Sequence, residues 1–377
     1  DMKRHFIFAA LLACSATIFG QESTNDNYQF TTVDSVGITP VKDQNQSGTC
    51  WSFSSISLLE SELIRLGKGE FDLSEMFVVH KTMEDRATAA VRTHGDVSYA
   101  PGGSFYDVIY SYKHYGMVPN DVMPGIKYDS DNHNHNELAS VAGAYVEAIA
   151  KSNSKRLTNV WHDGLSAIYD TYLGECPETF TVDGKEYTPR TYADEVLGLN
   201  MDDYISLTSF THHPFYETFI IEVPDNWRWA ESYNLPIEEL MEVMKYSIKN
   251  GYSFAWASDV SEKGFARNEG VAVVPEDDSK INEALKKPMP EKSITQEMRQ
   301  IAYDNWETTD DHGMHIFGIA KDQNGKEYFM VKNSWNTDAG RNGFWYASDA
   351  FVAYKTMNIV LHKDGIPKNI RKKLGIK

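Results

Sequence analysis

A single cysteine stands where a polar loop gives way to an apolar segment. Cys50 follows the loop 43–48, and the apolar residues after it recur at near-helical spacing as far as Gly67: Trp51, Phe53, Ile56, Leu59, Leu63 and Leu66. We therefore expect Cys50 in the first turn of a buried helix, where free backbone N–H groups favour a thiolate over a thiol. A thiolate in that position is a nucleophile. The alternative, a buried cysteine that packs as a small hydrophobe, stays open for this segment alone.

A glutamine close to this cysteine suggests a second chemical function. Gln44 lies six residues before Cys50, and Ser47 and Gly48 form a turn between them. A loop that folds back over the start of a helix can direct the Gln44 amide to the place where an oxyanion forms. The backbone N–H of Cys50 would be the second donor of that oxyanion hole.

The segment 37–53, GITPVKDQNQSGTCWSF, resembles the active-site segment of papain-like cysteine peptidases. Those enzymes usually carry a further cysteine where this chain has Ser47. The resemblance therefore implies that their disulfide from this loop is absent here.

A predicted β-hairpin in the last quarter of the chain contains the histidine that could act as a base toward the Cys50 thiol. Residues 315–320 and 328–331 read as two strands around a turn at 322–325. A two-residue loop would place His315 opposite Ser334, whereas a three-residue loop with Gly325 in the left-handed region places it opposite Asn333. An Asn oxygen in that place can orient the imidazole toward a thiol. We expect His315 to be the catalytic histidine, with His312 as its rival.

The residues that follow this hairpin strengthen the resemblance. The segment KNSW at 332–335, followed by GFW at 343–345, resembles a signature of the papain-like family. It implies a Cys50–His315–Asn333 triad with Gln44 in the oxyanion hole. Trp335 would shield the Asn–His hydrogen bond and border the substrate.

Two further segments match the family in the same order. Ser74, in the triplet LSE at 73–75, is expected to cap the next helix. The family's Gly-Gly strand hydrogen-bonds the substrate backbone, which makes Gly102 and Gly103 substrate-binding candidates. The alternative for these glycines is an ordinary turn before a helix.

The middle and the end of the chain resemble the bleomycin hydrolase/aminopeptidase C branch. The similar segments are 202–204, 234–240, 248–252 and 258–260. In that branch the C-terminal arm lies in the cleft and its carboxylate receives the free amine of the substrate, which would give this role to Lys377. A solvated basic tail and an endopeptidase with an open cleft are the alternatives.

Two pairs of histidines were considered as metal ligands. His133 and His135 alternate with asparagines, and His212 and His213 are adjacent. Neither pair has the spacing of a zinc motif, so we expect solvated loop histidines, no metal and no other cofactor.

Composition narrows the classes of partner. A net charge of −18 in 377 residues disfavours nucleic acid and anionic membranes as general partners. Peptide or protein substrates are expected. The resemblance also implies a homo-oligomer, a hexamer in relatives. From another class, a binding protein on an inactive peptidase scaffold remains open, although four intact site residues argue against it.

The first residues read as an export signal. A basic start at 2–4, an apolar stretch at 6–13 and small residues near 20 predict a signal peptide over 1–20 and a periplasmic or secreted protein. Lipid anchoring through Cys14 is the alternative. Without Cys14 two cysteines remain, and a Cys50–Cys176 disulfide is the structural alternative to catalysis.

The expected fold class is α+β, a papain-like peptidase with a helical lobe, a β-barrel-like lobe and a cleft between them. Within the domain 21–377 we predict the helical lobe at about 37–130, an insertion at 131–235, the β-rich lobe at 236–360 and a tail at 361–377.

Overall fold

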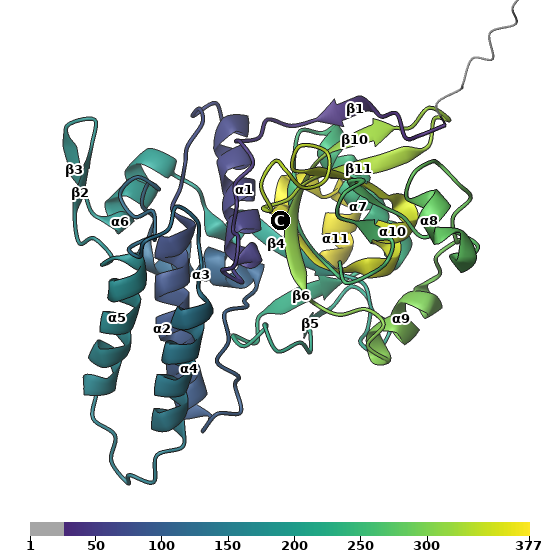
Figure 1. Cartoon of the computed structure of the whole chain (residues 1–377). Coiled ribbons are helices and arrows are strands. Elements are labelled where there is room, and N and C mark those ends of the chain that lie inside the picture. The colour runs from purple at the N-terminus through teal and green to yellow at the C-terminus, as the bar shows by residue number, and fades with distance from the viewer. Residues whose placement is uncertain (1–25) are drawn as a thin grey trace, which may run out of the picture.

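The computed structural model describes residues 26–377, and the expected signal peptide and Cys14 lie outside these residues. Figure 1 shows a group of helices on one side and a strongly coiled sheet on the other, with α1 at the boundary. Each side has its own apolar core. In the described part, no helix has the length and apolar character needed to cross a membrane.

The helical lobe is built on two helices that the sequence predicts well. α1 (Cys50–Arg65) starts at the cysteine and buries Ile56, Leu59 and Leu63 in the core of this lobe. α2 (Glu75–Arg92) begins at Ser74, whose hydroxyl accepts a hydrogen bond from the Phe77 N–H at 3.0 Å, so the predicted cap is confirmed. The other elements of this lobe are α3 (Phe105–Tyr115), α4 (Asn136–Ala150), α5 (Val160–Leu173), α6 (Pro189–Thr191), β2 (Phe180–Val182) and β3 (Lys185–Tyr187).

Within the described residues, eleven strands form one sheet in the order β5-β6-β4-β13-β7-β10-β11-β12-β9-β8, and β1 pairs with β10. The strands are β1 (Thr31–Ser35), β4 (Tyr204–Thr208), β5 (Thr218–Ile220), β6 (Glu231–Asn234), β7 (Phe254–Ser258), β8 (Phe265–Ala266), β9 (Val271–Ala272), β10 (His312–Lys321), β11 (Glu327–Lys332), β12 (Phe344–Ser348) and β13 (Thr356–His362). The helices of this lobe are α7 (Ile237–Lys249), α8 (Ile281–Ala284), α9 (Gln296–Asp304), α10 (Asp349–Lys355) and α11 (Lys368–Leu374).

The predicted insertion at 131–235 is not a separate unit. Its first half, α4 and α5, buries Leu138, Val146 and Leu165 in the same core as α1 and α2. Its second half supplies β4, β5 and β6 to the large sheet, where β4 pairs with β13. This division between the two lobes was not predicted, because helical periodicity does not show which neighbour a helix packs against.

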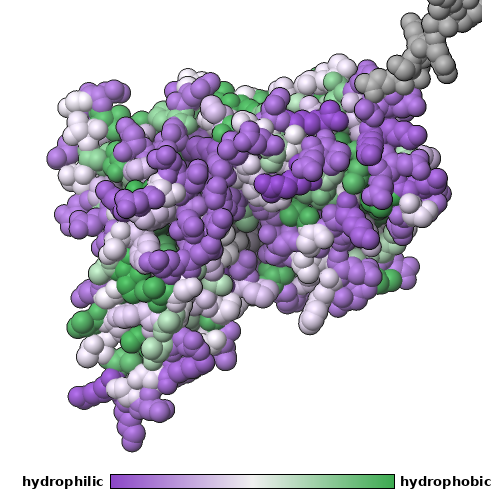
Figure 2. All heavy atoms as spheres, viewed as in Figure 1, coloured by the Kyte–Doolittle hydropathy of each residue, from purple (hydrophilic) through white to green (hydrophobic). Residues whose placement is uncertain are grey.

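Strand β10 carries the contact between the lobes. Gly313 faces α1, since a Cβ added there would lie 2.8 Å from the Ser54 Oγ. Two residues further on, the Nδ1 atom of His315 lies 2.8 Å from the Ser57 Oγ, also on α1. Ser54 and Ser57 therefore pack along β10, so that α1, a helix of the helical lobe, also contacts the sheet of the other lobe. Figure 2 shows that hydrophilic residues dominate the face in view, with apolar residues gathered over the helical lobe.

Candidate active site

Cys50 is the first residue of α1 and borders a cleft of about 310 Å³. Its thiol is free and half-buried. The adjacent Trp51 fixes this end of the helix, because its ring N–H donates to the Pro101 carbonyl at 3.0 Å. The N–H of the first helical residue has no partner inside the helix, which leaves it available to a ligand in the cleft.

The histidine in this cleft is His312, the first residue of β10. Its Nε2 atom lies 2.7 Å from the Oδ1 of Asn333. Because an amide oxygen only accepts, Nε2 carries the proton and Nδ1 is the basic ring nitrogen. The Trp335 ring packs on the imidazole, with the ring centres 4.6 Å apart. The next residue, Gly313, brings its backbone N–H to the Cys50 thiol.

The choice of His315 over His312 was wrong. His315 is fully buried and its Nδ1 contacts Ser57, seven residues along α1 from Cys50. Seven residues of helix span about 10 Å. His315 therefore lies two turns deeper than the thiol, between the lobes, and does not border the cleft.

A β-bulge explains this error. The predicted three-residue loop is confirmed, since Gly325 has φ +84° and the Asp322 N–H donates to the Lys326 carbonyl at 3.0 Å. From the turn as far as the pair Gly318–Met330, the strands keep the predicted register. Between Gly318 and Ile316 the register shifts by one residue, so that Lys332 and not Asn333 lies opposite His315. The extra residue is Phe317, whose carbonyl accepts from the Val36 N–H at 2.9 Å.

Gln44 lies where the sequence predicts it. Its N–H donates to the Ser334 carbonyl at 2.9 Å, and its Oε1 accepts from the Ser334 hydroxyl at 2.7 Å. These two bonds fix the side chain at the border of the cleft and leave its amide nitrogen as the donor. This is the arrangement that an oxyanion hole needs.

Gly102 and Gly103 also border the cleft. A Cβ on Gly103 would lie 2.7 Å from the Trp51 ring, and one on Gly102 would lie 2.4 Å from an Asp225 oxygen. The backbone approaches its neighbours too closely for a side chain at either position. Trp335 packs on the His312 imidazole and is not among the residues that line this cleft, so its predicted contact with substrate stays a prediction.

The prediction that Lys377 lies in the cleft was wrong. α11 packs Ile370 and Leu374 into the core of the β-rich lobe, and Lys373 pairs with Glu239 of α7 at 2.5 Å. The tail starts near the far end of α1, because Tyr252 packs under Arg65 and stacks on His362, at the start of the tail. A 16-residue helix is about 24 Å long, so the start of the tail and the thiol lie at opposite ends of α1.

The family is decided by a comparison with protein-family models. The model described as the Peptidase C1-like family matches residues 12–376. The chain belongs to this family. Within it, the similarity is to the aminopeptidase C/bleomycin hydrolase branch, as the sequence predicts.

The relatives of this C1-like chain are distant. Aminopeptidase G from Lactobacillus delbrueckii subsp. lactis is 24% identical, over 87% of this chain and 82% of the relative. Aminopeptidase C from Listeria innocua is 22% identical, over 88% and 81%. The crystal structure of PepW from Lactobacillus rhamnosis HN001 superposes with a TM-score of 0.71 at 21% identity, over 92% and 84%. The predicted papain-like α+β fold is confirmed.

Three carboxyl groups in the cleft of this C1-like chain are not among the site residues predicted from the sequence. Asp225, Asp310 and Asp311 all border it. The signal for two of them was the acidic pair directly before His312. Asp225 comes from the loop after β5, and no pattern in the sequence connects it with the site.

These acids and the burial of the site set its protonation. Burial, with Asp310 and Asp225 nearby, raises the pKa of the Cys50 thiol to about 12. Burial lowers the pKa of His312 to about 4, against the opposing effect of its bond to Asn333. Burial thus favours the uncharged form of both groups and opposes the thiolate that the helix position alone predicts.

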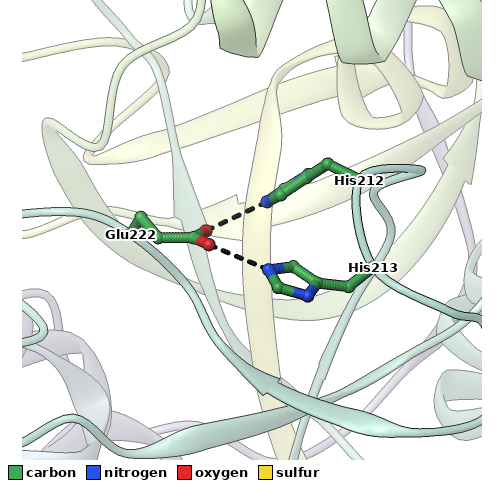
Figure 3. A group of neighbouring side chains, drawn as sticks. All are labelled: His212, His213 and Glu222. Carbon is green, nitrogen blue, oxygen red and sulfur yellow. Dashed lines mark hydrogen bonds and ion pairs between the residues drawn. The ribbon is translucent and has the colours of Figure 1, made fainter.

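The histidines considered as metal ligands lie elsewhere. Figure 3 shows His212 and His213 both directed at Glu222, with Nε2–oxygen distances of 3.0 and 2.8 Å. The Gln300 amide nitrogen contacts the Nδ1 of His212 at 3.1 Å, while its Oε1 accepts from the Thr211 N–H. Because Nδ1 must then accept, the proton of His212 is on Nε2, the atom that a metal would need. The hydrogen bonds of the group are thus satisfied without an ion.

The structure also shows whether the two cysteines of the described residues form a disulfide. Cys50 and Cys176 are both free thiols. The structural alternative, a disulfide between them, is therefore wrong.

Proposed function

We propose that this protein is a cysteine peptidase that hydrolyses peptide bonds through Cys50, His312 and Asn333. The observation that carries the proposal is the 2.7 Å bond from His312 to Asn333 in the same cleft as a free thiol at a helix start. Membership of the Peptidase C1-like family supports it.

The site suggests the following steps. As a peptide carbonyl approaches, the Cys50 proton passes to Nδ1 of His312, and sulfur attacks the carbonyl carbon. The amide of Gln44 and the Cys50 N–H stabilise the oxyanion; losing one such donor raises the barrier by about 3 kcal/mol. His312 then gives the proton to the leaving amine. Water, deprotonated by His312, cleaves the thioester and restores the thiol. Asn333 orients the imidazole throughout.

The first experiment compares two histidines that the hairpin contains. Cys50→Ala and His312→Ala should each lower peptidase kcat/KM by about 1000-fold or more. His315→Gln, the matched control on the same strand, should keep most of the activity of the fraction that folds. Thermal unfolding of each variant separates loss of fold from loss of chemistry. Full activity in Cys50→Ala would refute Cys50 as the nucleophile, whereas a wild type without peptidase activity would support the inactive-scaffold alternative.

We propose that the enzyme acts as an aminopeptidase. The named functions of its relatives support this, since they are called aminopeptidases C, G and W. A peptidase that cleaves within chains is the second candidate, because the tail lies away from the cleft. A substrate with a free N-terminal amine and its N-acetylated form separate the two, since an endopeptidase accepts both.

We also propose export, on the N-terminal pattern alone. Fractionation of cells that express the complete chain tests it, and retention of the uncleaved protein inside the cell would refute it.

A further inference from the structure

One carboxyl group in the cleft lacks a partner. Asp225 receives a hydrogen bond from the buried Arg86 at 3.3 Å, and Asp311 accepts from the backbone N–H of Val260 at 2.8 Å. Asp310 forms no hydrogen bond or ion pair with any residue from 26 to 377. It nevertheless borders the same cleft as the thiol. An unpaired, half-buried carboxyl group is costly to keep ionised, unless a ligand supplies the positive charge.

We propose that Asp310, supported by Asp225, binds the α-ammonium group of the substrate's N-terminal residue. This inference rests on the proposed peptidase function. It assigns to two side chains of the cleft the recognition of the amine, for which the C-terminal carboxylate of Lys377 is too remote.

The position of Asp225 favours an N-terminal amine over a longer chain. Its carboxylate lies directly over Gly102, where even a Cβ would come within 2.4 Å of Oδ2. Arg86 fixes this arrangement, because it also donates to the Gly102 carbonyl at 2.5 Å. The backbone that would pair with an extended substrate is therefore covered at Gly102. A peptide that ends in an ammonium group at this point meets both acids.

The acids also link recognition to the nucleophile. Burial raises the pKa of Cys50 most, and the negative charges of Asp310 and Asp225 raise it further. An ammonium group bound between them neutralises that field and favours transfer of the thiol proton to His312. A substrate with a free amine would thus activate the thiol that cleaves it, whereas an acetylated substrate would not.

The experiment measures kcat/KM for a fluorogenic substrate in which an amide bond joins alanine to a fluorescent leaving amine. The N-terminus of the alanine is either free or acetylated. Asp310→Asn should lower the value for the free form by about 10-fold or more, as expected for loss of a charge-assisted bond, and should not lower the value for the acetylated form. Asp278→Asn is the matched control, since that side chain is 80% exposed and lies outside the cleft. Removal of Ile376 and Lys377 should also change nothing.

A readout besides turnover follows the thiol. The rate of Cys50 alkylation by iodoacetamide, measured against pH, should show a lower apparent pKa in Asp310→Asn than in the wild type. An unchanged alkylation pKa would contradict the electrostatic link.

The remaining outcomes are distinguishable. If Asp310→Asn keeps its preference for the free amine while cleavage still depends on Cys50, Asp310 is not the anchor and the peptidase stands. If removal of the last two residues abolishes the preference, the tail is the anchor. Asp310 could instead bind a basic side chain of the substrate, and an acetylated dipeptide substrate with lysine in its first position tests this. If Asp310→Asn slows cleavage of that substrate but not of the substrate with a free α-amine, the assignment to the α-amine is overturned. Absence of any Cys50-dependent cleavage refutes the proposed function itself.

Discussion

Asp310→Asn should make the protein more stable at neutral pH. Burial, together with Asp225 and Asp311, raises the pKa of Asp310 from 3.8 to about 7. The folded state therefore holds this proton more tightly than the unfolded state does. Below pH 3.8 both states are protonated and the group contributes nothing. Between pH 4 and pH 7 the unfolded state ionises first, so stability falls as the pH rises, and above pH 7 the loss is constant.

The size of this effect follows from the shift. One pKa unit corresponds to about 1.36 kcal/mol, so a rise of about three units corresponds to about 4 kcal/mol at pH 8. Asp310 is only half-buried, and solvent screening reduces that figure to on the order of 1–3 kcal/mol. At pH 4.5 the same reasoning leaves less than about 1 kcal/mol.

Urea unfolding of the wild type and of Asp310→Asn, at pH 4.5 and at pH 8, measures the effect. Titrating groups that do not interact with Asp310 cancel in the difference between the two proteins. The gain in unfolding free energy should be larger at pH 8 by on the order of 1–3 kcal/mol. An equal difference at both pH values would show that Asp310 has an ordinary pKa, and the reasoning would be refuted.

Three further substitutions test contacts around the site. Gly313→Val should push β10 off Ser54 and lower both kcat and the melting temperature, as enzyme assays and calorimetry would show; an unchanged kcat would contradict the described interface. Ser334→Ala should free the Gln44 amide and lower kcat several-fold with little change in KM, and a change in KM alone would contradict its role. Ser74→Ala should lower the unfolding free energy by about 1–2 kcal/mol in urea titrations, with activity intact below the transition.

Local patterns predicted the elements of this fold. The helix at Cys50, the Ser74 cap and the loop at Gly325 each depend on residues within a few positions of one another, and all three are confirmed. The partnership of Gln44 and Ser334 could be expected only in part, because the family resemblance gave Gln44 but not the group that holds it.

The errors arose from contacts between distant segments. His315 was preferred because an unbroken hairpin would place it beside Asn333, but the bulge at Phe317 depends on Val36, about 280 residues earlier. Asp225 enters the cleft from a loop that no periodicity connects to Gly102. The tail leaves the cleft because Ile370 is buried in the β-rich core, and a short basic segment does not reveal where its two apolar residues pack.

The placement of α1 has a consequence for how activity appears during folding. The nucleophile belongs to the helical lobe, whereas His312 and Asn333 belong to the sheet, and α1 meets β10 through small side chains rather than through a large apolar surface. A chain with one lobe folded therefore contains a thiol or a base, but not the pair. Recovery of turnover after dilution from denaturant should then lag behind recovery of secondary structure, since enzyme assays report only the docked molecule.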